Sequence, residues 1–182
     1  MCHPSVLTWA GSLSPDLVAD RTICEVGSYD VNGSVRPTLA AHGPTSYVGV
    51  DQTPGPGVDV VADVADLPEL YPAGFDVVIT TEMLEHVEDW RAAMYGLVAL
   101  VKVGGHLALT TRSPGFPYHP FPIDCWRYPV DTMREILTAL GLEVVSCVDD
   151  PEAPGVFAVA KKTKTTNHKK KDPLAAIEVP GV

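Results

Sequence analysis

The segment Ile23–Ser34 places the tightest constraint on the fold of this chain. Residues 23–26 form a short apolar run that is typical of a buried strand, and the run breaks at Gly27 into a loop that reaches Gly33 before a helix begins. Glycine at such a break lets the backbone approach a ligand closely, and the first amides of a helix point into the same cleft. The pattern therefore predicts a strand, loop and helix arranged around a bound molecule.

A second strand, residues 47–50, ends in Asp51. Taken alone, an aspartate after a strand is more often a helix cap or a turn residue. Here it follows the first strand by about twenty residues, the spacing at which nucleotide-binding α/β folds place an acid on the ribose. A carboxylate has two oxygens that can accept hydrogen bonds from a vicinal diol. Together the two features predict a cofactor site built around an adenosine.

Strands and helices alternate along the rest of the chain, which is typical of a mostly parallel sheet with helices on both faces. We expect strands over residues 22–26, 46–50, 58–62, 75–80, 106–111, 142–148 and 156–160, the last two as a hairpin, and helices over about 34–41, 89–101 and 131–140. Residues 5–20 have roughly helical spacing broken at Pro15. They predict a helical cap within residues 1–20.

Charge is unevenly distributed along the chain. Residues 161–182 hold six lysines against two acidic residues, which leaves 7 basic and 21 acidic residues in 1–160, a formal charge of −14. A body this acidic repels phosphate backbones, so nucleic acid is an unlikely substrate. We predict one domain over residues 1–160 and a flexible lysine-rich tail over residues 161–182.

The four cysteines are scattered, with no CxxC pair and no metal-ligand spacing. No apolar run approaches the roughly 20 residues of a membrane span, and the N-terminus lacks a basic segment followed by an apolar one. We therefore expect a cytoplasmic protein without a membrane segment. His86, Glu88 and Asp89 lie close together in sequence, but their spacing is not diagnostic of a metal site, and we predict none.

Three strand-end motifs occur in order: the acid and glycine of Glu25–Gly27, the segment 61–68, and the segment 76–87. With these motifs the chain resembles the small, single-domain, type 11-like members of the class I S-adenosylmethionine-dependent methyltransferases, over about residues 20–160. The resemblance implies a Rossmann-like, doubly wound α/β fold with a mostly parallel seven-stranded sheet and an antiparallel final strand. It also implies S-adenosylmethionine as the cofactor.

The resemblance implies cofactor contacts on all of these motifs. The first loop would contribute Glu25, Gly27, Ser28, Tyr29, Asn32 and Gly33, although Tyr29 and Val31 replace the family's later glycines. Asp51 would bind the ribose hydroxyls and Gln52 the adenosine. Asp63 would accept from the adenine amino group, with the amide of Val64 against the ring. Thr81 and Glu82 would line the methionine end of the cofactor.

The loop from Arg112 to Tyr128 is rich in proline and aromatic residues. It follows the fifth strand, at the edge where open α/β sheets bind ligands, and aromatic walls with a few polar groups suit a small-molecule pocket. His119 or Asp124 could take a proton from a hydroxyl of a sugar or phenol. The alternative is a rigid loop that only covers the core, with Arg127 paired to Asp124. His86 is either a third catalytic candidate or a tether for a loop.

These observations predict an enzyme that methylates a small-molecule acceptor, with a hydroxyl of a sugar or natural-product-like compound as the acceptor group. Two alternatives remain: a non-catalytic binding or assembly module, and a methyltransferase that acts on a macromolecule. The C-terminal tail could serve a homodimer or a protein partner. A nicotinamide-dependent oxidoreductase is disfavoured, because no GxGxxG follows the first strand.

Overall fold

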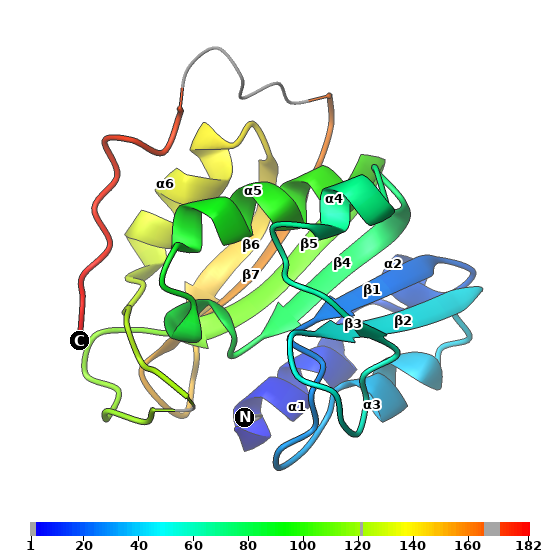
Figure 1. Cartoon of the computed structure of the whole chain (residues 1–182), viewed down its shortest axis with the longest axis horizontal. Coiled ribbons are helices and arrows are strands. Elements are labelled where there is room, and N and C mark those ends of the chain that lie inside the picture. The colour runs from blue at the N-terminus through cyan, green and yellow to red at the C-terminus, as the bar shows by residue number, and fades with distance from the viewer. Residues whose placement is uncertain (1–2, 121, 166–171) are drawn as a thin grey trace.

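Seven strands form one sheet at the centre of the molecule (Figure 1). The computed structural model describes residues 3–120, 122–165 and 172–182. The strands are β1 (Thr22–Val26), β2 (Ser46–Asp51), β3 (Val60–Val61), β4 (Phe75–Thr81), β5 (Val101–Arg112), β6 (Glu143–Asp149) and β7 (Gly155–Lys161). Their order is β3-β2-β1-β4-β5-β7-β6, and β7 runs antiparallel to both of its neighbours. The predicted Rossmann-like fold with antiparallel final strands is confirmed.

Helices cover both faces of the sheet (Figure 1). One face carries α1 (Pro4–Ser12), α2 (Pro15–Val18) and α3 (Arg36–Ala40), and the other carries α4 (Leu67–Leu70), α5 (Trp90–Leu100) and α6 (Val130–Ala139). Neighbouring residues of β1 point to opposite faces, so that Ile23 packs under α1–α3 while Cys24 packs under α4–α6. The apolar runs in the strands are therefore buried from both sides.

Local sequence signals set several of the helix ends. Pro15 begins α2, and the side chain of Asp89 caps α5 by accepting from the amide of Ala92 at 3.0 Å. Gly141 follows α6 with a φ of +77°, where glycine is favoured. Asp131 lies within the first turn of α6, after Pro129 at the cap position, so the helix begins one residue earlier than predicted.

The predicted flexible tail is wrong for the residues at the end of the chain that the structure describes. Lys161 ends β7, and the buried Nζ of Lys162 donates to the carbonyls of Val98 and Val101, both at 2.8 Å. The prediction of a flexible tail also covers residues 166–171, which include three of the six lysines. These residues lie outside the part of the chain that the structure describes.

Residues 172–182 return along α5 toward the loop after β5. Leu174, Ile177 and Val179 join the core under α4–α6. Arg91 of α5 donates from Nε to the carbonyl of Leu174 at 3.2 Å and from Nη2 to that of Ile177 at 2.7 Å. Burial of three apolar side chains, together with these hydrogen bonds, accounts for the ordered path. The role of the tail in a homodimer or protein partnership stays a prediction.

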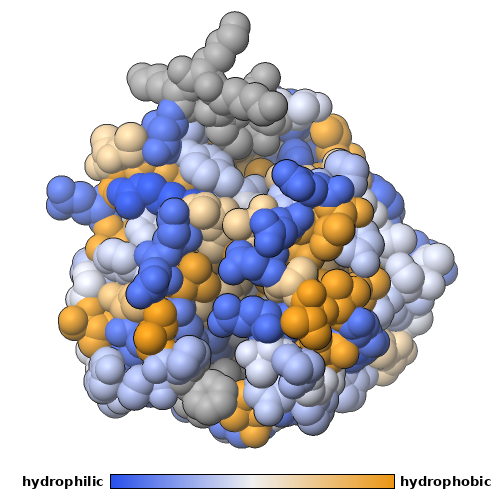
Figure 2. Space-filling view, in the orientation of Figure 1, coloured by the Kyte–Doolittle hydropathy of each residue, from blue (hydrophilic) through white to orange (hydrophobic). Residues whose placement is uncertain are grey.

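Among the described residues, no helix has the length and hydrophobicity that a membrane span requires. On the face shown in Figure 2, apolar and polar residues are intermixed. The face does not show one continuous apolar surface.

Candidate active site

The chain reverses its direction across the sheet at β1, which lies between β2 and β4. Both neighbours run parallel to β1, so the loops that follow the three strands meet at one edge. Ligands of open α/β sheets bind at such a switch point, outside the carboxyl ends of the strands. This edge holds the first loop, the residues after β2 and the residues after β4.

Gly27 begins the first loop in a conformation that favours glycine. Its φ is +80°, and a Cβ atom there would lie 2.9 Å from the side chain of Met83. The amides of Gly27 and Ser28 donate to the carbonyl of Val50 at 2.8 and 3.0 Å, which folds the loop over the end of β2. The hydroxyls of Ser28 and Thr80 are buried without a hydrogen-bond partner among the described residues. A glycine cradle with buried free hydroxyls fits a ligand that brings its own polar groups.

The carboxylate of Asp51 is held by the loops on either side. Its Oδ2 accepts from the amide of Tyr29 at 3.3 Å and its Oδ1 accepts from the amide of Thr53 at 2.9 Å. Each carboxylate oxygen has two lone pairs, so each oxygen retains one for a ligand. The half-buried, oriented carboxylate fits the ribose diol that the sequence predicts.

The other predicted cofactor residues lie on loops around the same strand ends. Asn32 and Gln52 are exposed, and the amide of Gly33 donates to Asp30. Asp63 is exposed, and its Oδ1 accepts from the amide of Ala65 at 2.8 Å in a local turn. Val64 is half-buried after β3. Their contacts with a cofactor stay predictions.

Glu25, the first of the predicted cofactor residues, is buried in β1. Its Oε2 accepts from the hydroxyl of Tyr47 on β2 at 2.8 Å, and its side chain lies on the α1–α3 face. Burial raises the pKa of Glu25 to about 7. The hydrogen bond from Tyr47 thus links β1 to β2, and a contact of Glu25 with the cofactor stays a prediction.

The end of β4 carries a buried ionic network. Glu82 has a φ of +53°, rare for a non-glycine residue, and its Oε1 accepts from the hydroxyl of Thr110 at 2.9 Å. It pairs with Arg112, whose Nη1 also lies 3.1 Å from Asp150. Burial, with the charge of Glu85 next, raises the pKa of Glu82 to about 8. Thr81, buried beside it, is the other residue predicted at the methionine end.

The sequence did not single out Arg112 and Asp150 as site residues. Asp150 also accepts from the hydroxyl of Ser5 in α1 at 2.8 Å, so the network ties the N-terminal helix to β5. Their ion pair joins residues 38 positions apart and leaves no local pattern in the sequence.

The loop after β5 is braced by an ion pair between Asp124 and Arg127. Arg127 donates from Nη1 and Nη2 to the two carboxylate oxygens at 2.6 and 2.7 Å, and the amide of His119 donates to Oδ2 at 2.8 Å. Burial opposes ionisation, but the hydrogen bonds from Arg127 and His119 lower the pKa of Asp124 to about 2. A carboxylate held in this way is a weak base, and the predicted catalytic role of Asp124 stays a prediction. Its contacts hold the backbone amide and the ring of His119 in place.

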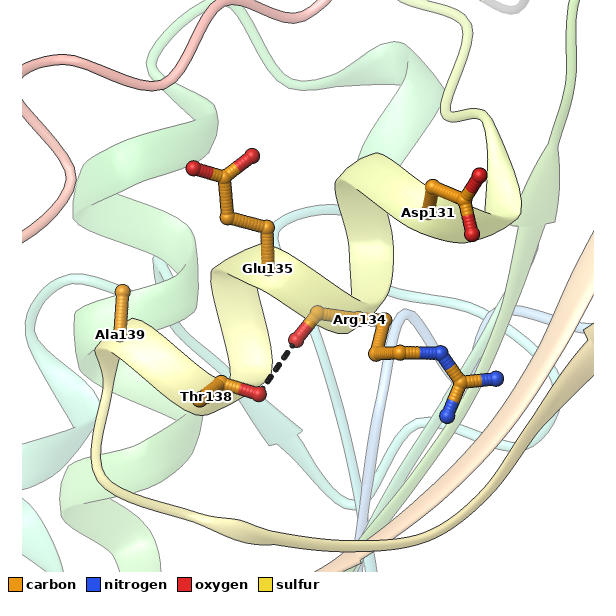
Figure 3. Close-up of a pocket in the computed structure, with 5 residues that line it drawn as sticks. All are labelled: Asp131, Arg134, Glu135, Thr138 and Ala139. Atoms are coloured by element: carbon orange, nitrogen blue, oxygen red, sulfur yellow. Dashed lines mark hydrogen bonds between the residues drawn. The ribbon is translucent and has the colours of Figure 1, made fainter.

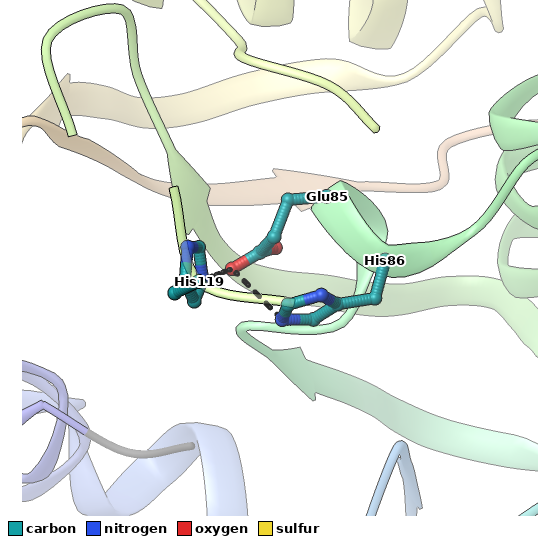
Figure 4. A group of neighbouring side chains, drawn as sticks. All are labelled: Glu85, His86 and His119. Atoms are coloured by element: carbon teal, nitrogen blue, oxygen red, sulfur yellow. Dashed lines mark ion pairs between the residues drawn. The ribbon is translucent and has the colours of Figure 1, made fainter. Parts of the chain in front are cut away.

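His119 and His86 meet beside Glu85 (Figure 4). His86 Nδ1 lies 2.5 Å from the carbonyl of Ile123, as expected of the predicted loop tether. The Nε2 atoms of His86 and His119 lie 4.0 and 3.8 Å from Oε1 of Glu85. Glu85 is fully buried, and the side-chain interaction with Glu85, together with the charge of Asp124, raises the pKa of His119 although burial opposes the shift. The sequence contained Glu85 within the fourth-strand motif, but nothing in the motif marked it.

A shallow hollow lies on the outside of α6, lined by Asp131, Arg134, Glu135, Thr138 and Ala139 (Figure 3). The hydroxyl of Thr138 donates to the carbonyl of Arg134, and Arg134 donates to the carbonyl of Cys147 at 2.7 Å. These groups satisfy one another within the helix and the neighbouring strand, and the side chains in Figure 3 do not converge. We therefore place the active site at the strand ends.

Comparison with known proteins identifies the family. The family described as "Methyltransferase domain" matches residues 10–147, which is most of the chain. The chain belongs to this methyltransferase family. S-Adenosylmethionine is therefore the cofactor, and the roles of Gly27 and Asp51 in binding it stay predictions.

Two curated relatives match short stretches of this methyltransferase chain. Both are named ubiquinone biosynthesis O-methyltransferase. The one from Photorhabdus laumondii subsp. laumondii is 44% identical over 43 residues, 24% of this chain and 18% of the relative. The one from Vibrio atlanticus is 36% identical over 64 residues, 35% of this chain and 27% of the relative. Each matched stretch thus spans less than a third of the relative's length.

Solved structures resemble the methyltransferase chain over much more of its length. The 1,6-didemethyltoxoflavin-N1-methyltransferase of Burkholderia thailandensis, with bound 1,6-didemethyltoxoflavin and S-adenosylhomocysteine, has a TM-score of 0.69 at 16% identity and covers 87% of this chain and 78% of its own. The N-methyltransferase NodS of Bradyrhizobium japonicum WM9, in complex with S-adenosylhomocysteine, has a TM-score of 0.67 at 19% identity over 89% of each chain. At these identities the likeness shows a shared fold.

Proposed function

We propose that this protein catalyses methyl transfer from S-adenosylmethionine to a hydroxyl of a small, ring-bearing acceptor. The observation that carries the proposal is that Gly27 and Asp51 lie at the ends of neighbouring strands, at the switch point of the sheet. Gly27 opens the loop over the end of β2, and the amide of Tyr29 in that same loop orients the Asp51 carboxylate. The family match supports the class of reaction, and the names of the relatives include an O-methyltransferase.

The cofactor supplies a methyl group already activated by a positive sulfur. The chain therefore has to align the acceptor and exclude water from the site. The loop after β5 is suited to both tasks, because the Asp124–Arg127 pair and the hydrogen bond from the hydroxyl of Ser113 to the carbonyl of Tyr128, at 2.7 Å, hold its two ends.

The acceptor side of the site offers aromatic surface and one imidazole. The guanidinium of Arg112 lies 4.1 Å from the ring centre of Phe116, and the ring centres of Phe116 and His119 are 4.9 Å apart. Tyr118 beside them is 65% exposed, which leaves its ring open to contact with a ligand. These rings favour an acceptor with a ring of its own, such as a phenol or a sugar. The side chain of His119 is 15% exposed, and we assign it the removal of the hydroxyl proton.

Calorimetric titration with S-adenosylmethionine tests the proposal most directly. The native protein should bind, and Asp51→Ala should bind at least about tenfold more weakly, since each tenfold change corresponds to about 1.4 kcal/mol and the variant loses hydrogen bonds to the ribose. Asp66→Ala is the matched control, because Asp66 is an exposed aspartate whose side chain does not cap α4.

The titration, together with assays of turnover, separates the proposal from its alternatives. A folded native protein that binds neither S-adenosylmethionine nor S-adenosylhomocysteine would contradict it. Binding that leads to no S-adenosylhomocysteine with hydroxylated aromatic or sugar acceptors would favour the non-catalytic binding module. Turnover with a protein or nucleic acid alone would favour the macromolecular alternative.

A further inference from the structure

Three side chains from two distant segments present ligand atoms to one point beside the acceptor loop. Glu85 and His86 lie in the single 3-10 turn after β4 (Leu84–His86), and His119 lies in the loop after β5. Their ligand atoms all lie within 4.8 Å of one another (Figure 4). Two imidazoles and one carboxylate form a donor set that binds divalent transition metals such as zinc and iron.

Each imidazole is oriented through its other nitrogen. His86 Nδ1 lies 2.5 Å from the carbonyl of Ile123, and His119 Nδ1 lies 3.1 Å from both the carbonyl of Pro117 and Oδ2 of Asp124. A carbonyl only accepts, so a neutral imidazole at either position carries its proton on Nδ1 and keeps a lone pair on Nε2. Metal-binding histidines are held in this way by carbonyl or carboxylate partners. Both Nε2 atoms point toward Glu85 (Figure 4).

The buried carboxylate of Glu85 is satisfied at only one of its two oxygens among the described residues. Its Oε2 accepts from the hydroxyl of Thr111 at 2.8 Å, but its Oε1 is buried with no hydrogen-bond partner among the described residues. The two Nε2 atoms lie 3.8 and 4.0 Å away, too far for hydrogen bonds to Oε1. A buried carboxylate oxygen without a partner is unfavourable by about 1–3 kcal/mol or more, so the site is incomplete without a further group.

The charges around the loop lead to the same conclusion. Of the buried carboxylates around this loop, Glu82 and Asp150 share Arg112, and Asp124 pairs with Arg127. Glu85 has ion-pair contacts only with imidazoles within the described parts of the chain. Buried charges are normally paired or bound to a metal. A cation at the centre of the three ligands would supply the missing positive charge.

We propose that Glu85, His86 and His119 bind a divalent first-row transition-metal ion, with zinc as the reference metal. The three ligand atoms lie within 4.8 Å of one another, so a small inward movement of the side chains would allow the 2.0–2.2 Å bonds of zinc to nitrogen and oxygen. The imidazoles are 12% and 15% exposed while Glu85 is fully buried, so an ion enters from the imidazole side. Positions on that side remain for water or an oxygen of the acceptor.

The consequence for catalysis rests on the methyltransferase function proposed above. A metal ion in contact with the acceptor hydroxyl lowers its pKa, so the proton leaves to solvent without a side-chain base. The oxygen keeps the electron pair, which forms the new bond to the methyl carbon as the carbon–sulfur bond breaks and its pair stays on sulfur. His119 then acts as a ligand in place of the base assigned above.

Zinc titration by calorimetry, in the absence of cofactor and acceptor, tests the site itself. We expect one ion per native chain with low-micromolar or tighter affinity, and Co²⁺ in its place should give a visible absorption band. Glu85→Gln retains the acceptor for Thr111 but loses the charge, and His119→Gln removes one nitrogen. Each should weaken zinc binding on the order of 100-fold. His42→Gln, which changes a half-buried histidine after α3, is the control and should bind as the native protein does.

The outcomes separate this proposal from the one on function. Absence of zinc and cobalt binding by the folded native protein, or equal binding by Glu85→Gln and His119→Gln, would overturn the metal site. Equal loss in His42→Gln would indicate unspecific binding to histidines and would overturn it as well. Because S-adenosylmethionine binding is measured separately and depends on Asp51, it can succeed where metal binding fails. A failure of the methyltransferase function would likewise leave the zinc titration interpretable.

Discussion

Glu25 is a buried carboxylate whose ionisation couples to folding. It is 3% exposed and accepts one hydrogen bond, from the hydroxyl of Tyr47. Burial raises its pKa from 4.5 to about 7, although Tyr47 and Arg36 oppose the shift and Asp30 and Asp59 add to it. Between these two pH values the folded state holds a proton that the unfolded state has lost. The stabilisation is complete below pH 4.5 and is lost as the pH rises to about 7.

We predict that Glu25→Gln flattens the pH dependence of the free energy of unfolding. Glutamine resembles the protonated acid and still accepts from Tyr47. Relative to the native protein, the variant should gain up to about 3 kcal/mol between pH 4.5 and pH 8, because one pKa unit corresponds to about 1.4 kcal/mol. Urea unfolding at several pH values measures this gain. Two curves that run parallel between pH 4.5 and pH 8 would show that Glu25 titrates normally in the fold.

At the scale of elements, the C-terminal segment 172–182 acts as part of the core. Leu174 is fully buried against the α4–α6 side of the sheet, and its carbonyl accepts from Arg91. Leu174→Ala should lower the free energy of unfolding by about 2–4 kcal/mol, through lost burial and the cavity left behind. Chemical denaturation measures the change.

Leu70→Ala provides the control for this prediction. Leu70 at the end of α4 is 59% exposed, and its truncation should change stability by no more than about 0.5 kcal/mol. If Leu174→Ala and Leu70→Ala have the same small effect, residues 172–182 do not contribute to the core in solution.

Local sequence patterns predicted the elements whose signals lie within one segment. The apolar run 75–80 became β4, and the helical spacing of 89–101 became α5. The segment 172–182 carries its apolar residues without periodicity, and they are buried only when the segment contacts α5 and the loop after β5. The two-residue β3 is shorter than predicted, and β5 begins at Val101, five residues earlier than predicted.

The candidate site likewise contains residues that local sequence signals predicted and residues that they did not. Gly27 and Asp51 were predictable, because a strand-end glycine and an acid after the next strand are local signals. Glu85 was not, because its environment arises only when the loop after β5 folds back and brings His119 to it, 34 positions along the chain. Metal sites and ion pairs assembled from separate loops depend on tertiary structure in this way.

At the scale of the whole molecule, one sheet joins the half that contains β1–β3 to the half that contains β5–β7. β1 and β4 pair over four residues, and β4 continues the sheet into β5. The Ser5–Asp150–Arg112 contacts link the first helix to the second half as well. The unfolding of either half would expose the buried edge of the other, so we expect one cooperative transition.

We therefore predict that S-adenosylhomocysteine stabilises the entire molecule, although its predicted contacts lie mainly on the loops after β1, β2, β3 and β4. At about 100 times its Kd, a ligand that binds only the folded state adds about 2.7 kcal/mol. For a chain of this size that corresponds to a rise in Tm of about 5–10 °C. Calorimetry should show a single transition that moves as a whole, and Asp51→Ala, which binds at least about tenfold more weakly, should lose about half of the shift or more at the same ligand concentration. Two transitions, of which only one responds to the ligand, would mean that the halves fold independently despite their shared sheet.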